Sequence, residues 1–535
     1  MTPFASYTRP VVVDLTVCFS PPTVTPSTCE QGRGTWHRIE KDLYLHTSRQ
    51  HAWLYVALAN EEDFAAEDLL VTDIRVGERP LNPGLGHVWK SRPGGIWVLR
   101  RKFSGSIDRA VTEVDILFGT DAVDPRPQWT LLISSLQLSG QPEVPIARLS
   151  VLHGRARPVP DARAALRVSE DGTFKIVQIS DTHMVTGVGV CNDAIDVNGK
   201  HLPASEADPL TVAFIASILD AEKPDLVILT GDQVHHDTPD SQTALFKVVA
   251  PIIERAIPFA AVFGNHDCEG TYALSPSTLA DYASGTAQMS ILRNLPFNLC
   301  ESGPEQVDGM GNFCLNVLAP APSHVSLSTL YFLDSHGQIL GKKRNYDHIK
   351  QSQIDWFTGL CQSQRRVREK DNNVTPIHLS LVFQHIPLPE FVDCRPGIRS
   401  GHQRERPEVP RFNSGFYDAL VKEGISAFGC GHDHVNDFCA LLPQQKLRDR
   451  DKLTQPGPWL CYGGGSGFGG YSSFGGRRYH RRARVWQLDT GTASLRTWKR
   501  VEYSTDRVDD LLLVEGGAVV DDPGEEYGSR NCVLN

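Results

Sequence analysis

Acidic, imidazole and amide side chains recur in five short blocks in the middle of the chain. The blocks are Asp181-Thr-His183, Gly231-Asp232, Gly264-Asn265-His266-Asp267, His385, and Gly431-His432-Asp433-His434. Carboxylate oxygens and imidazole nitrogens together suit divalent ions such as Mn²⁺, Fe²⁺ and Zn²⁺. Two such ions held close together can clamp a phosphate group and lower the pKa of a bound water. The residue types therefore predict a two-ion centre with the chemistry of phosphate-ester hydrolysis.

The segments before these blocks have the character of buried strands. They are Phe174–Ser180, Asp225–Thr230, Pro258–Phe263, Ile377–Phe383 and Ile425–Gly429. Segments with helical spacing of apolar residues lie between them, at Pro209–Glu222, Ser241–Ala256, His348–Val367 and Asn413–Glu423. In open α/β sheets, ligands bind beyond the carboxyl ends of the strands. An α/β domain would therefore bring the five blocks together.

The region before this domain has a different pattern. Residues 36–150 contain short runs rich in β-branched and aromatic residues, separated by Gly, Pro and Asp. The runs are Leu43–Leu45, His51–Ala57, Leu69–Ile74, Ile96–Phe103, Val114–Phe118 and Trp129–Ile133. We expect an N-terminal β-rich accessory domain at 1–165, the α/β domain at 166–503, and an acidic, flexible tail at 504–535.

Composition narrows the class of protein. The 535 residues are 40% hydrophobic with a net charge of −10, which favours a globular protein and argues against a nucleic-acid-binding one. No stretch is long and apolar enough for an integral membrane segment, and the start does not resemble a signal peptide. We therefore expect a cytoplasmic protein with reduced cysteines. The final Cys532-Val-Leu-Asn535 has the form of a prenylation box with an unusual last residue, and is more typical of an ordinary tail.

In their order, D-x-H, G-D, G-N-H-D, a lone His and G-H-x-H, the five blocks resemble the signature of the calcineurin-like metallophosphoesterases. The segments FGNHDCEG, HIPLPEF, GHDHVNDFC and LCYGGGSGFGGY are similar to fungal cell-cycle-regulator phosphatases and plant purple-acid-phosphatase-like proteins. The resemblance covers about residues 170–500. It implies a two-sheet β-sandwich flanked by helices.

The resemblance also implies roles for individual residues. The first metal ion would be held by Asp181, His183, Asp232 and His434. The second would share Asp232 as a bridge and add Asn265, His385 and His432. His266 would contact the phosphate or protonate the leaving oxygen, with Asp267 orienting it. The implied reaction is attack by a metal-bound hydroxide on a phosphate ester.

One position departs from the purple acid phosphatases, which place a metal-bound Tyr three residues after the bridging Asp. Here His235 occupies that position, so a tyrosinate–iron(III) colour is not expected. Mn, Fe or Zn, or a mixture, fits the remaining ligands. His235 is either an extra ligand, a residue behind the ligands, or an ordinary surface histidine.

Several segments could contact the substrate. Five arginines lie in Arg395–Arg411, and Arg395 and Arg399 could clamp a phosphate or simply be solvated. Arg477, Arg478, Arg481 and Arg482 pose the same choice, and Asn192, Asp193 and His201 could form part of a lid. The glycine-rich segment 463–476 could allow close approach of the backbone or merely flexibility.

The substrate class stays open at this point. A phosphate monoester, either a phosphoprotein or a small phosphorylated metabolite, is favoured by the resemblance. The same pair of ions would serve a phosphodiesterase. A remote alternative is a non-catalytic scaffold that binds a protein partner through the N-terminal domain.

Overall fold

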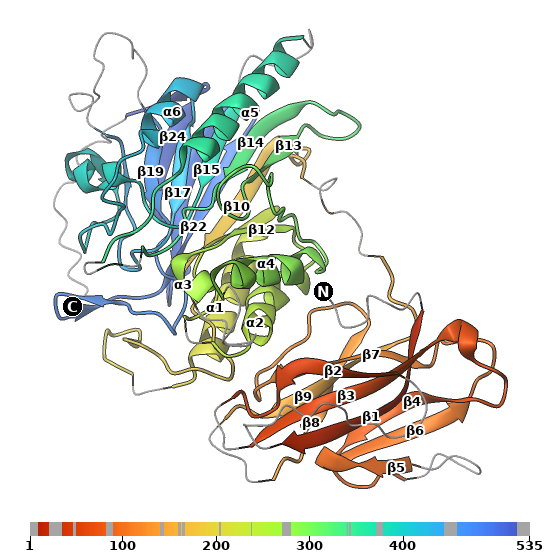
Figure 1. The fold of residues 1–535 in the computed structure, drawn as a ribbon. Coiled ribbons are helices and arrows are strands. Elements are labelled where there is room, and N and C mark those ends of the chain that lie inside the picture. Colours follow the sequence, from red (N-terminus) through yellow and green to blue (C-terminus); the bar gives the residue numbers. More distant parts are fainter. Residues whose placement is uncertain are drawn as a thin grey trace.

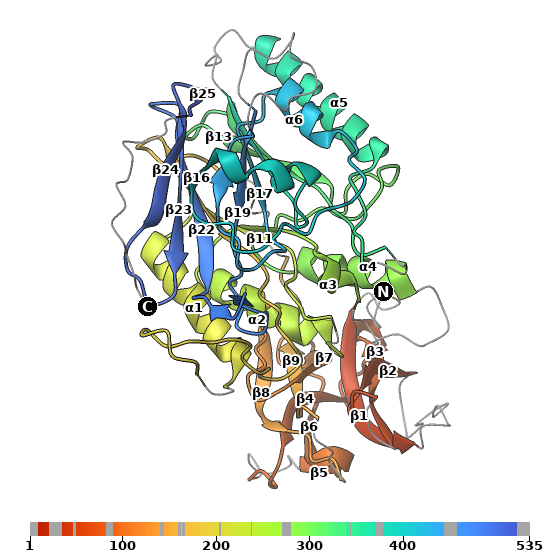
Figure 2. The same ribbon diagram turned by 90° about the vertical axis from the view of Figure 1, so that its left-hand side faces the viewer.

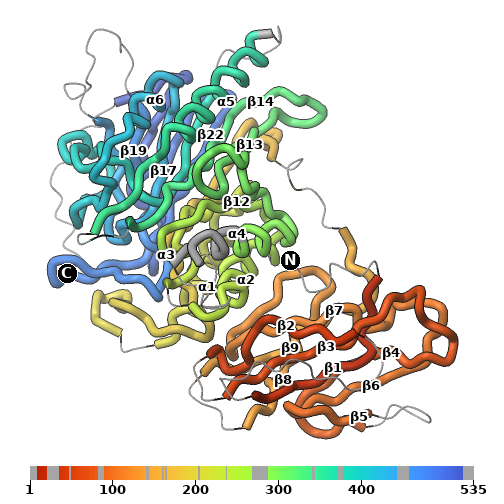
Figure 3. The backbone as a smooth tube through the Cα atoms, viewed as in Figure 1, coloured from red at the N-terminus to blue at the C-terminus, as the bar shows by residue number. Residues whose placement is uncertain are grey.

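The computed structural model describes most of the chain. The described residues are 9–20, 35–46, 50–81, 89–139, 144–158, 162, 166–202, 205–236, 238–269, 280–339, 341, 344–370, 378–442 and 457–521. Cys532 and residues 522–535 of the expected tail lie outside these ranges. In Figure 3 the red and orange part of the chain forms one body, and the yellow-to-blue part forms a second, larger one.

The N-terminal body is built from small antiparallel sheets, with strand orders β1-β3-β2, β4-β6-β5 and β7-β9-β8 (Figure 1). The strands are β1 (Pro10–Ser20), β2 (Thr35–Asp42), β3 (His51–Asn60), β4 (Leu69–Val76), β5 (Trp89–Arg92), β6 (Ile96–Lys102), β7 (Val111–Phe118), β8 (Trp129–Ser135) and β9 (Ala147–His153). Short 3₁₀ turns lie at Glu61–Asp63 and Pro93–Gly95. Inward-facing residues such as Leu15, Val56 and Ile116 share one core.

One expected strand in this body is wrong. Leu43–Leu45 is a turn between β2 and β3, because the buried carboxylate of Asp42 accepts backbone N–H groups from Tyr44, His46 and Ala52. A short acidic side chain that binds nearby N–H groups in this way favours a turn over a ladder. The apolar segment Pro10–Phe19, too short for a membrane span, instead forms most of β1.

The second body contains two seven-stranded mixed sheets. Their orders are β12-β11-β10-β22-β23-β24-β25 and β13-β14-β15-β17-β19-β18-β16. The first consists of β10 (Thr173–Ile179), β11 (Leu226–Thr230), β12 (Phe259–Val262), β22 (Arg482–Asp489), β23 (Ser494–Val501), β24 (Val508–Glu515) and β25 (Ala518–Val519). The second consists of β13 (Phe313–Leu318), β14 (Ser326–Phe332), β15 (Leu379–Phe383), β16 (Ile398–Ser400), β17 (Ala427–Cys430), β18 (Cys439–Ala440) and β19 (Trp459–Tyr462).

The two sheets share one apolar core, to which Val177 and Trp486 contribute from the first sheet and Phe383 and Trp459 from the second. Such a core between two sheets, with helices outside, is the predicted α/β sandwich. Strands β10, β11 and β12 are parallel, as are β14, β15, β17 and β19. The carboxyl ends of each parallel set therefore meet at one edge.

Helices cover the outer faces of the sheets (Figure 2). They are α1 (Ala207–Glu222), α2 (Ser241–Ile253), α3 (Asn265–Glu269), α4 (Ala280–Arg293), α5 (Gln351–Lys370) and α6 (Phe416–Glu423). Further 3₁₀ turns lie at Pro389–Asp393 and Arg395–Gly397, and a short hairpin joins β20 (Ser473–Phe474) to β21 (Arg477–Arg478). Helix α2 begins where Asp240 accepts the N–H of Thr243, an N-cap bond. None of the described helices is both long and apolar enough to cross a membrane.

The predicted start of the flexible tail at residue 504 is wrong. Strand β24 pairs with β23, and β25 pairs with β24, so the ordered sheet continues to Val519. Asp509 and Asp510 gave this segment the composition of an acidic tail, so the sequence did not predict a strand here. Their charges are met by cations, because Lys499 Nζ contacts Asp509 and Arg496 Nη2 lies 2.8 Å from Asp510.

Polar contacts join the two bodies at α2. The backbone N–H of Phe118 donates to Thr243 Oγ1 over 3.1 Å, and Lys247 Nζ lies 2.7 Å from Asp121 Oδ2. The same ammonium group also contacts Asp208 at the start of α1. These contacts attach the N-terminal body to helices α1 and α2, which follow strands β10 and β11.

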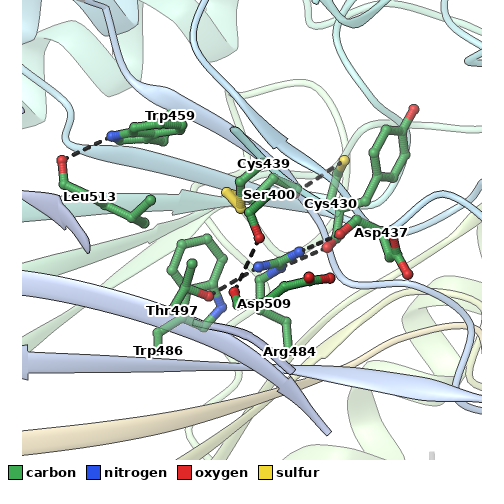
Figure 4. The surroundings of a disulfide bond; sticks show 12 residues. Ser400, Cys430, Asp437, Cys439, Trp459, Arg484, Trp486, Thr497, Asp509 and Leu513 are labelled. Atoms are coloured by element: carbon green, nitrogen blue, oxygen red, sulfur yellow. Dashed lines mark hydrogen bonds between the residues drawn. A yellow bond between two sulfur atoms is a disulfide. The ribbon is translucent and has the colours of Figure 1, made fainter. Parts of the chain in front are cut away.

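The expectation that the cysteines are reduced is wrong for part of the set. Cys439 and Cys461 form a disulfide between β18 and β19, and Cys18 is also disulfide-bonded. Figure 4 shows the first of these beside Cys430, Asp437 and Arg484. The free cysteines among the described residues are Cys191, Cys300, Cys314, Cys361, Cys394 and Cys430.

Candidate metal centre

Four of the seven predicted ligands have an unusual backbone conformation. Asp181 and His183 follow β10 with φ of 55° and 47°, Asp232 follows β11 with φ of 53°, and His432 follows β17 with φ of 78°. Positive φ in residues other than glycine is uncommon, costs about 1–3 kcal/mol and concentrates at functional sites. The strain lies at the strand ends where the sequence predicts the chemistry.

The first group of converging side chains consists of Asp181, His183 and His434, which are all buried. His183 Nε2 lies 3.1 Å from His434 Nε2, and His434 Nε2 lies 3.4 Å from Asp181 Oδ1. The three residues come from loops that are 251 positions apart in the sequence, because β10 and β17 end at the same edge of the sandwich.

A second group of buried residues lies beside the first and consists of Asp232, His385 and His432. His385 Nε2 is 3.3 Å from Asp232 Oδ2 and 3.3 Å from His432 Nδ1. The same Asp232 oxygen is 3.8 Å from His183 Nε2 in the first group. One carboxylate oxygen therefore faces both groups, which is the position that a bridging ligand needs.

Asn265 begins α3 directly after β12. Its side-chain Oδ1 is buried and has no hydrogen-bond partner within the described part of the chain. Its neighbours on both sides lie against Asp232, because the N–H of His266 donates to Asp232 Oδ1 and a Cβ on Gly264 would lie 2.1 Å from that oxygen. An unpaired buried acceptor costs about 1–3 kcal/mol, so a bound cation would stabilise this arrangement.

Hydrogen bonds behind two of the imidazoles fix which nitrogen faces inward. His385 Nδ1 lies 2.8 Å from the carbonyl oxygen of Thr230, and His434 Nδ1 lies 2.8 Å from that of Tyr471. A carbonyl can only accept, so each Nδ1 carries the proton and each Nε2 offers a lone pair to the centre. This is how proteins orient metal-binding histidines.

Burial controls the protonation of the imidazoles. It lowers the pKa of His183 well below the ordinary value, with a further decrease from His434, and it lowers the pKa of His432 in the same way, beside His385. Burial alone would also lower the pKa of His385, but the carboxylate of Asp232 outweighs it and raises that pKa to about 10.

The glycine-rich segment packs its backbone onto the ligands. Gly467 N–H donates to the carbonyl of Asp181 and Gly465 N–H donates to that of His434. A Cβ on Gly470 would lie 2.5 Å from His434 Cε1 and 2.7 Å from His183 Cδ2, closer than any side chain permits. Of the two predicted explanations for these glycines, close approach is therefore correct.

His266 lies at the rim of the centre, with its Nε2 4.0 Å from Asp232 Oδ2 and its side chain 26% exposed. Asp267, the residue predicted to orient His266, binds two backbone N–H groups of neighbouring loops. Asp267 Oδ1 accepts the N–H of Val234 and Oδ2 accepts the N–H of Gly264. Burial and, to a lesser degree, the nearby Asp232 together raise the pKa of Asp267 to about 7. Asp267 thus holds together the loops that carry the ligands.

His235 contacts the outer side of the first group. Its Nδ1 lies 3.2 Å from His183 Nδ1, the nitrogen that faces away from Asp232, and its ring stacks with that of His266. This placement fits a residue behind the ligands better than the other two predicted possibilities. It gives His183 Nδ1 an imidazole nitrogen as its partner, where His385 and His434 have a carbonyl oxygen.

The arginines that were predicted to clamp a phosphate do not gather beside the metal ligands. Arg399 is paired with Asp521, the last of the described residues, at 2.8 Å, and Arg395 lies in a 3₁₀ turn with its side chain at the surface. Arg481 and Arg482 are buried and bound within the structure, to Gly470 O and Asp437 respectively.

The other loop candidates have structural partners. Arg478 Nε lies 3.4 Å from Asp193, whose Oδ2 also accepts the hydroxyl of Ser473, and Asn192 N–H donates to Phe468 O. These bonds tie the loop after the first block to the glycine-rich segment. Arg477 and His201 are exposed.

Three residues near the centre were not predicted. The ring of Tyr471 stacks on His434 with centroids 4.1 Å apart, and Tyr346 meets His432 edge-on at 4.6 Å. Arg344 lies over the Tyr346 ring at 5.4 Å, and its charge contributes to the lowered pKa of His432. Tyr471 closes a glycine-rich motif that was noted in the sequence, whereas nothing around residues 344–346 distinguishes them there.

Comparisons with known proteins agree with this geometry. A family model described as "Calcineurin-like phosphoesterase" matches residues 174–436. The chain is 35% identical to "Phosphatase DCR2" of Saccharomyces cerevisiae over 76% of this chain and 67% of that protein. It is 32% identical to "Probable inactive purple acid phosphatase 29" of Arabidopsis thaliana, over 64% and 86% of the two chains. The chain belongs to the calcineurin-like phosphoesterases, and its similarity to phosphatases supports a hydrolase.

The residues present fit a pair of divalent ions. The two groups supply carboxylate oxygens and imidazole nitrogens, and Asn265 Oδ1 is a buried acceptor without a hydrogen-bond partner in the described chain. This mixture of donors suits Mn²⁺, Fe²⁺ or Zn²⁺. The family and the geometry together indicate a dimetal centre.

Proposed function

We propose that this chain is a binuclear metal-dependent phosphatase that hydrolyses phosphate monoesters, either of a phosphoprotein or of a small metabolite. The observation that carries the proposal is the placement of Asp232 Oδ2. It lies 3.3 Å from His385 Nε2 and 3.8 Å from His183 Nε2, between two groups of buried ligands. A site built around a shared carboxylate is suited to two ions acting on one substrate.

Each ion would have its own ligands. Asp181, His183 and His434 would hold the first ion, Asn265, His385 and His432 would hold the second, and Asp232 would be shared. When bound, the two ions supply neutralisation of the phosphoryl oxygens and an activated water at neutral pH.

His266 would act on the substrate. Its Nε2 is on the side of the ring that faces Asp232 and its side chain is partly exposed, so this nitrogen can reach a phosphate seated on the centre. Nε2–H would donate to a phosphoryl oxygen or give its proton to the departing alcohol oxygen, the role of a general acid.

The preference for monoesters rests on similarity to a protein named as a phosphatase, and substrate tests can separate it from the diesterase alternative. We expect the chain, loaded in turn with Mn²⁺, Fe²⁺ and Zn²⁺, to release phosphate from p-nitrophenyl phosphate or from phosphoserine peptides. Bis-p-nitrophenyl phosphate should be cleaved more slowly. A faster rate on the diester would mean that the chain is a phosphodiesterase and not a phosphomonoesterase.

Asp181→Asn is the matched negative control for this experiment, because it removes a ligand charge with little change in shape. Asp418→Asn on the exposed side of α6 is the positive control. If no ester is hydrolysed by the metal-loaded chain, the proposal fails and the non-catalytic scaffold replaces it.

We further propose that residues 1–165 act as an accessory unit that offers a surface to a protein partner, with the catalytic unit beginning at 166. The contacts of Lys247 with Asp121 and Asp208 attach this unit to the start of α1. Limited proteolysis of the full chain tests the division. Cleavage between Arg155 and Arg167 should leave two resistant fragments, and early cuts inside either unit would contradict it.

A further inference from the structure

A third group of potential metal ligands lies in the N-terminal body, at the turn between β2 and β3. It consists of Asp42, His46 and His51, whose ligand atoms all lie within 4.8 Å of one another. We propose that these three residues bind a zinc-type divalent cation, at a site separate from the candidate dimetal centre. In sequence they form the pattern D-x3-H-x4-H.

The two imidazoles converge on one carboxylate oxygen. His46 Nδ1 is 3.4 Å from Asp42 Oδ2, and His51 Nε2 is 3.8 Å from the same atom. In a tetrahedral zinc site with bonds of about 2.0–2.1 Å, neighbouring ligand atoms are about 3.3 Å apart. The two separations from Asp42 Oδ2 exceed this spacing by about 0.1 and 0.5 Å, and the two imidazole nitrogens lie within 4.8 Å of each other.

The carboxylate is held in place before any ion binds. Asp42 is buried, its Oδ1 accepts the N–H groups of Tyr44 and Ala52, and its Oδ2 accepts the N–H of His46. Such backbone bonds orient a ligating carboxylate and add to its affinity for an ion. Among the described residues Oδ2 accepts only this one N–H, which leaves it a lone pair for a further contact.

The surroundings of the imidazoles complete the case. Both rings meet Trp53 edge-on, with centroids 5.7 Å away for His46 and 6.3 Å for His51. The indole forms an apolar wall on one side, while the His46 side chain is 41% exposed on the other. A cation could therefore enter from solvent and keep water in a fourth position.

A purely structural role explains Asp42 but not the histidines. Its bonds to the backbone N–H groups of Tyr44, His46 and Ala52 account for the turn, and none of them involves an imidazole ring. An ion pair with Asp42 would need only one charged imidazole, and two charged rings would repel each other. A dication uses both neutral rings and the carboxylate at once, which matches the preference of Zn²⁺ for nitrogen with oxygen.

The bound cation would cross-link the two sides of the β2–β3 turn, close to the junction between the two bodies. Lys41, adjacent to Asp42, has its Nζ 3.3 Å from Asp240, the residue that caps α2. Ion binding would therefore stabilise the N-terminal body, and we expect little effect on hydrolysis.

The test compares zinc content of the full chain with that of the double variant His46→Gln/His51→Gln. After loading with Zn²⁺ and removal of the excess, elemental analysis should show one zinc fewer per chain in the double variant. The control His37→Gln, on the same strand as Asp42 but outside the group, should bind as much zinc as the parent. Hydrolysis of p-nitrophenyl phosphate should stay within about twofold. Equal zinc in the parent and the double variant overturns the proposal.

A second measurement uses the parent chain and does not depend on the variants folding. Diethyl pyrocarbonate modifies accessible histidines, and mass spectrometry locates the modified residues. Zn²⁺ should reduce modification of His46 and His51 at least fivefold and leave His37 unchanged. Equal modification with and without Zn²⁺ also overturns the proposal.

Discussion

Two buried polar clusters, one around Asp437 and one at the candidate metal centre, balance their charges in different ways. At Asp437, cations surround one carboxylate. Arg404 Nη1 lies 2.8 Å and Lys499 Nζ 3.0 Å from Asp437 Oδ2, and Arg482 contacts the same oxygen. Figure 4 shows Arg484 reaching the same residue, where its Nη2 donates to the backbone oxygen of Asp437.

At the candidate metal centre the acceptors outnumber the cations. Two carboxylates, four imidazoles and an amide oxygen face inward, and burial keeps His183 and His432 neutral. Such a cluster is costly unless cations enter it, because buried charges and acceptors need partners. The comparison gives a criterion for distinguishing the two kinds of cluster. In a structural ion network, side-chain cations of the protein neutralise the carboxylate, whereas a group of metal ligands leaves acceptors for cations from solution.

The largest expected effect comes from Asp232→Asn, which removes the shared carboxylate from the cage. Both ions should be lost, and hydrolysis of p-nitrophenyl phosphate should fall by about 10³-fold or more. Elemental analysis and initial rates provide the measurement. A variant that still holds two ions would show that Asp232 is not the bridge.

His266→Ala asks whether a group at the rim of the cage acts on the substrate and not on the ions. The metal content should stay the same while kcat falls by about 10²–10⁴-fold. Replacement by Gln should restore hydrogen bonding to phosphate but not proton donation. The recovery of kcat should therefore be smallest for substrates whose alcohol is a poor leaving group. Unchanged kcat in the Ala variant would remove His266 from the mechanism.

Asp437→Ala tests the other side of the comparison. Arg482 and Lys499 would remain buried without their carboxylate, and the free energy of unfolding should fall by about 3–5 kcal/mol. Burial alone would raise the Asp437 pKa, but Lys499 and Arg482 hold it well below the ordinary value. Its contribution to stability is therefore present above about pH 4 and is lost as the pH falls through the lowered pKa.

Denaturant unfolding of the parent and Asp437→Ala at neutral pH gives the size of this contribution. Metal content of the folded variant is the control, since the ligands are unchanged. A loss below about 1 kcal/mol would mean that the cations find other partners, and that the network is less self-contained than its distances indicate.

His235→Ala should have a smaller effect than loss of a ligand. Without the contact to His183 Nδ1, that imidazole is held less firmly, and metal affinity or turnover should fall by about 10–100-fold. Competition with a chelator measures the affinity. No change in either quantity would return His235 to the class of ordinary surface histidines.

The smallest effect is expected at Arg399. Because Arg399 is paired with Asp521, Arg399→Glu should cost about 0–1 kcal/mol of stability and leave KM for p-nitrophenyl phosphate unchanged. Arg344→Ala, which removes a charge near His432, should raise KM several-fold. The reverse result would restore the predicted clamp and exclude Arg344.

The sequence predicted which residues meet because each ligand follows a strand, and parallel strands end together. It failed where a partner lies on a distant element. The pairing of Cys439 with Cys461 depends on the register of β18 and β19, and that of Arg399 with Asp521 depends on the final strands. Leu43–Leu45 was misassigned because side-chain bonds from Asp42 outweighed the β propensity of the segment.

The contact of Gly470 with both His183 and His434 has a consequence for how the protein matures. During synthesis the first ligand leaves the ribosome long before the backbone segment that presses on its ring. A chain that stops short of residue 470 would contain every ligand but lack the surface that positions two of them. We therefore expect metal to be captured late, after nearly the whole polypeptide has emerged.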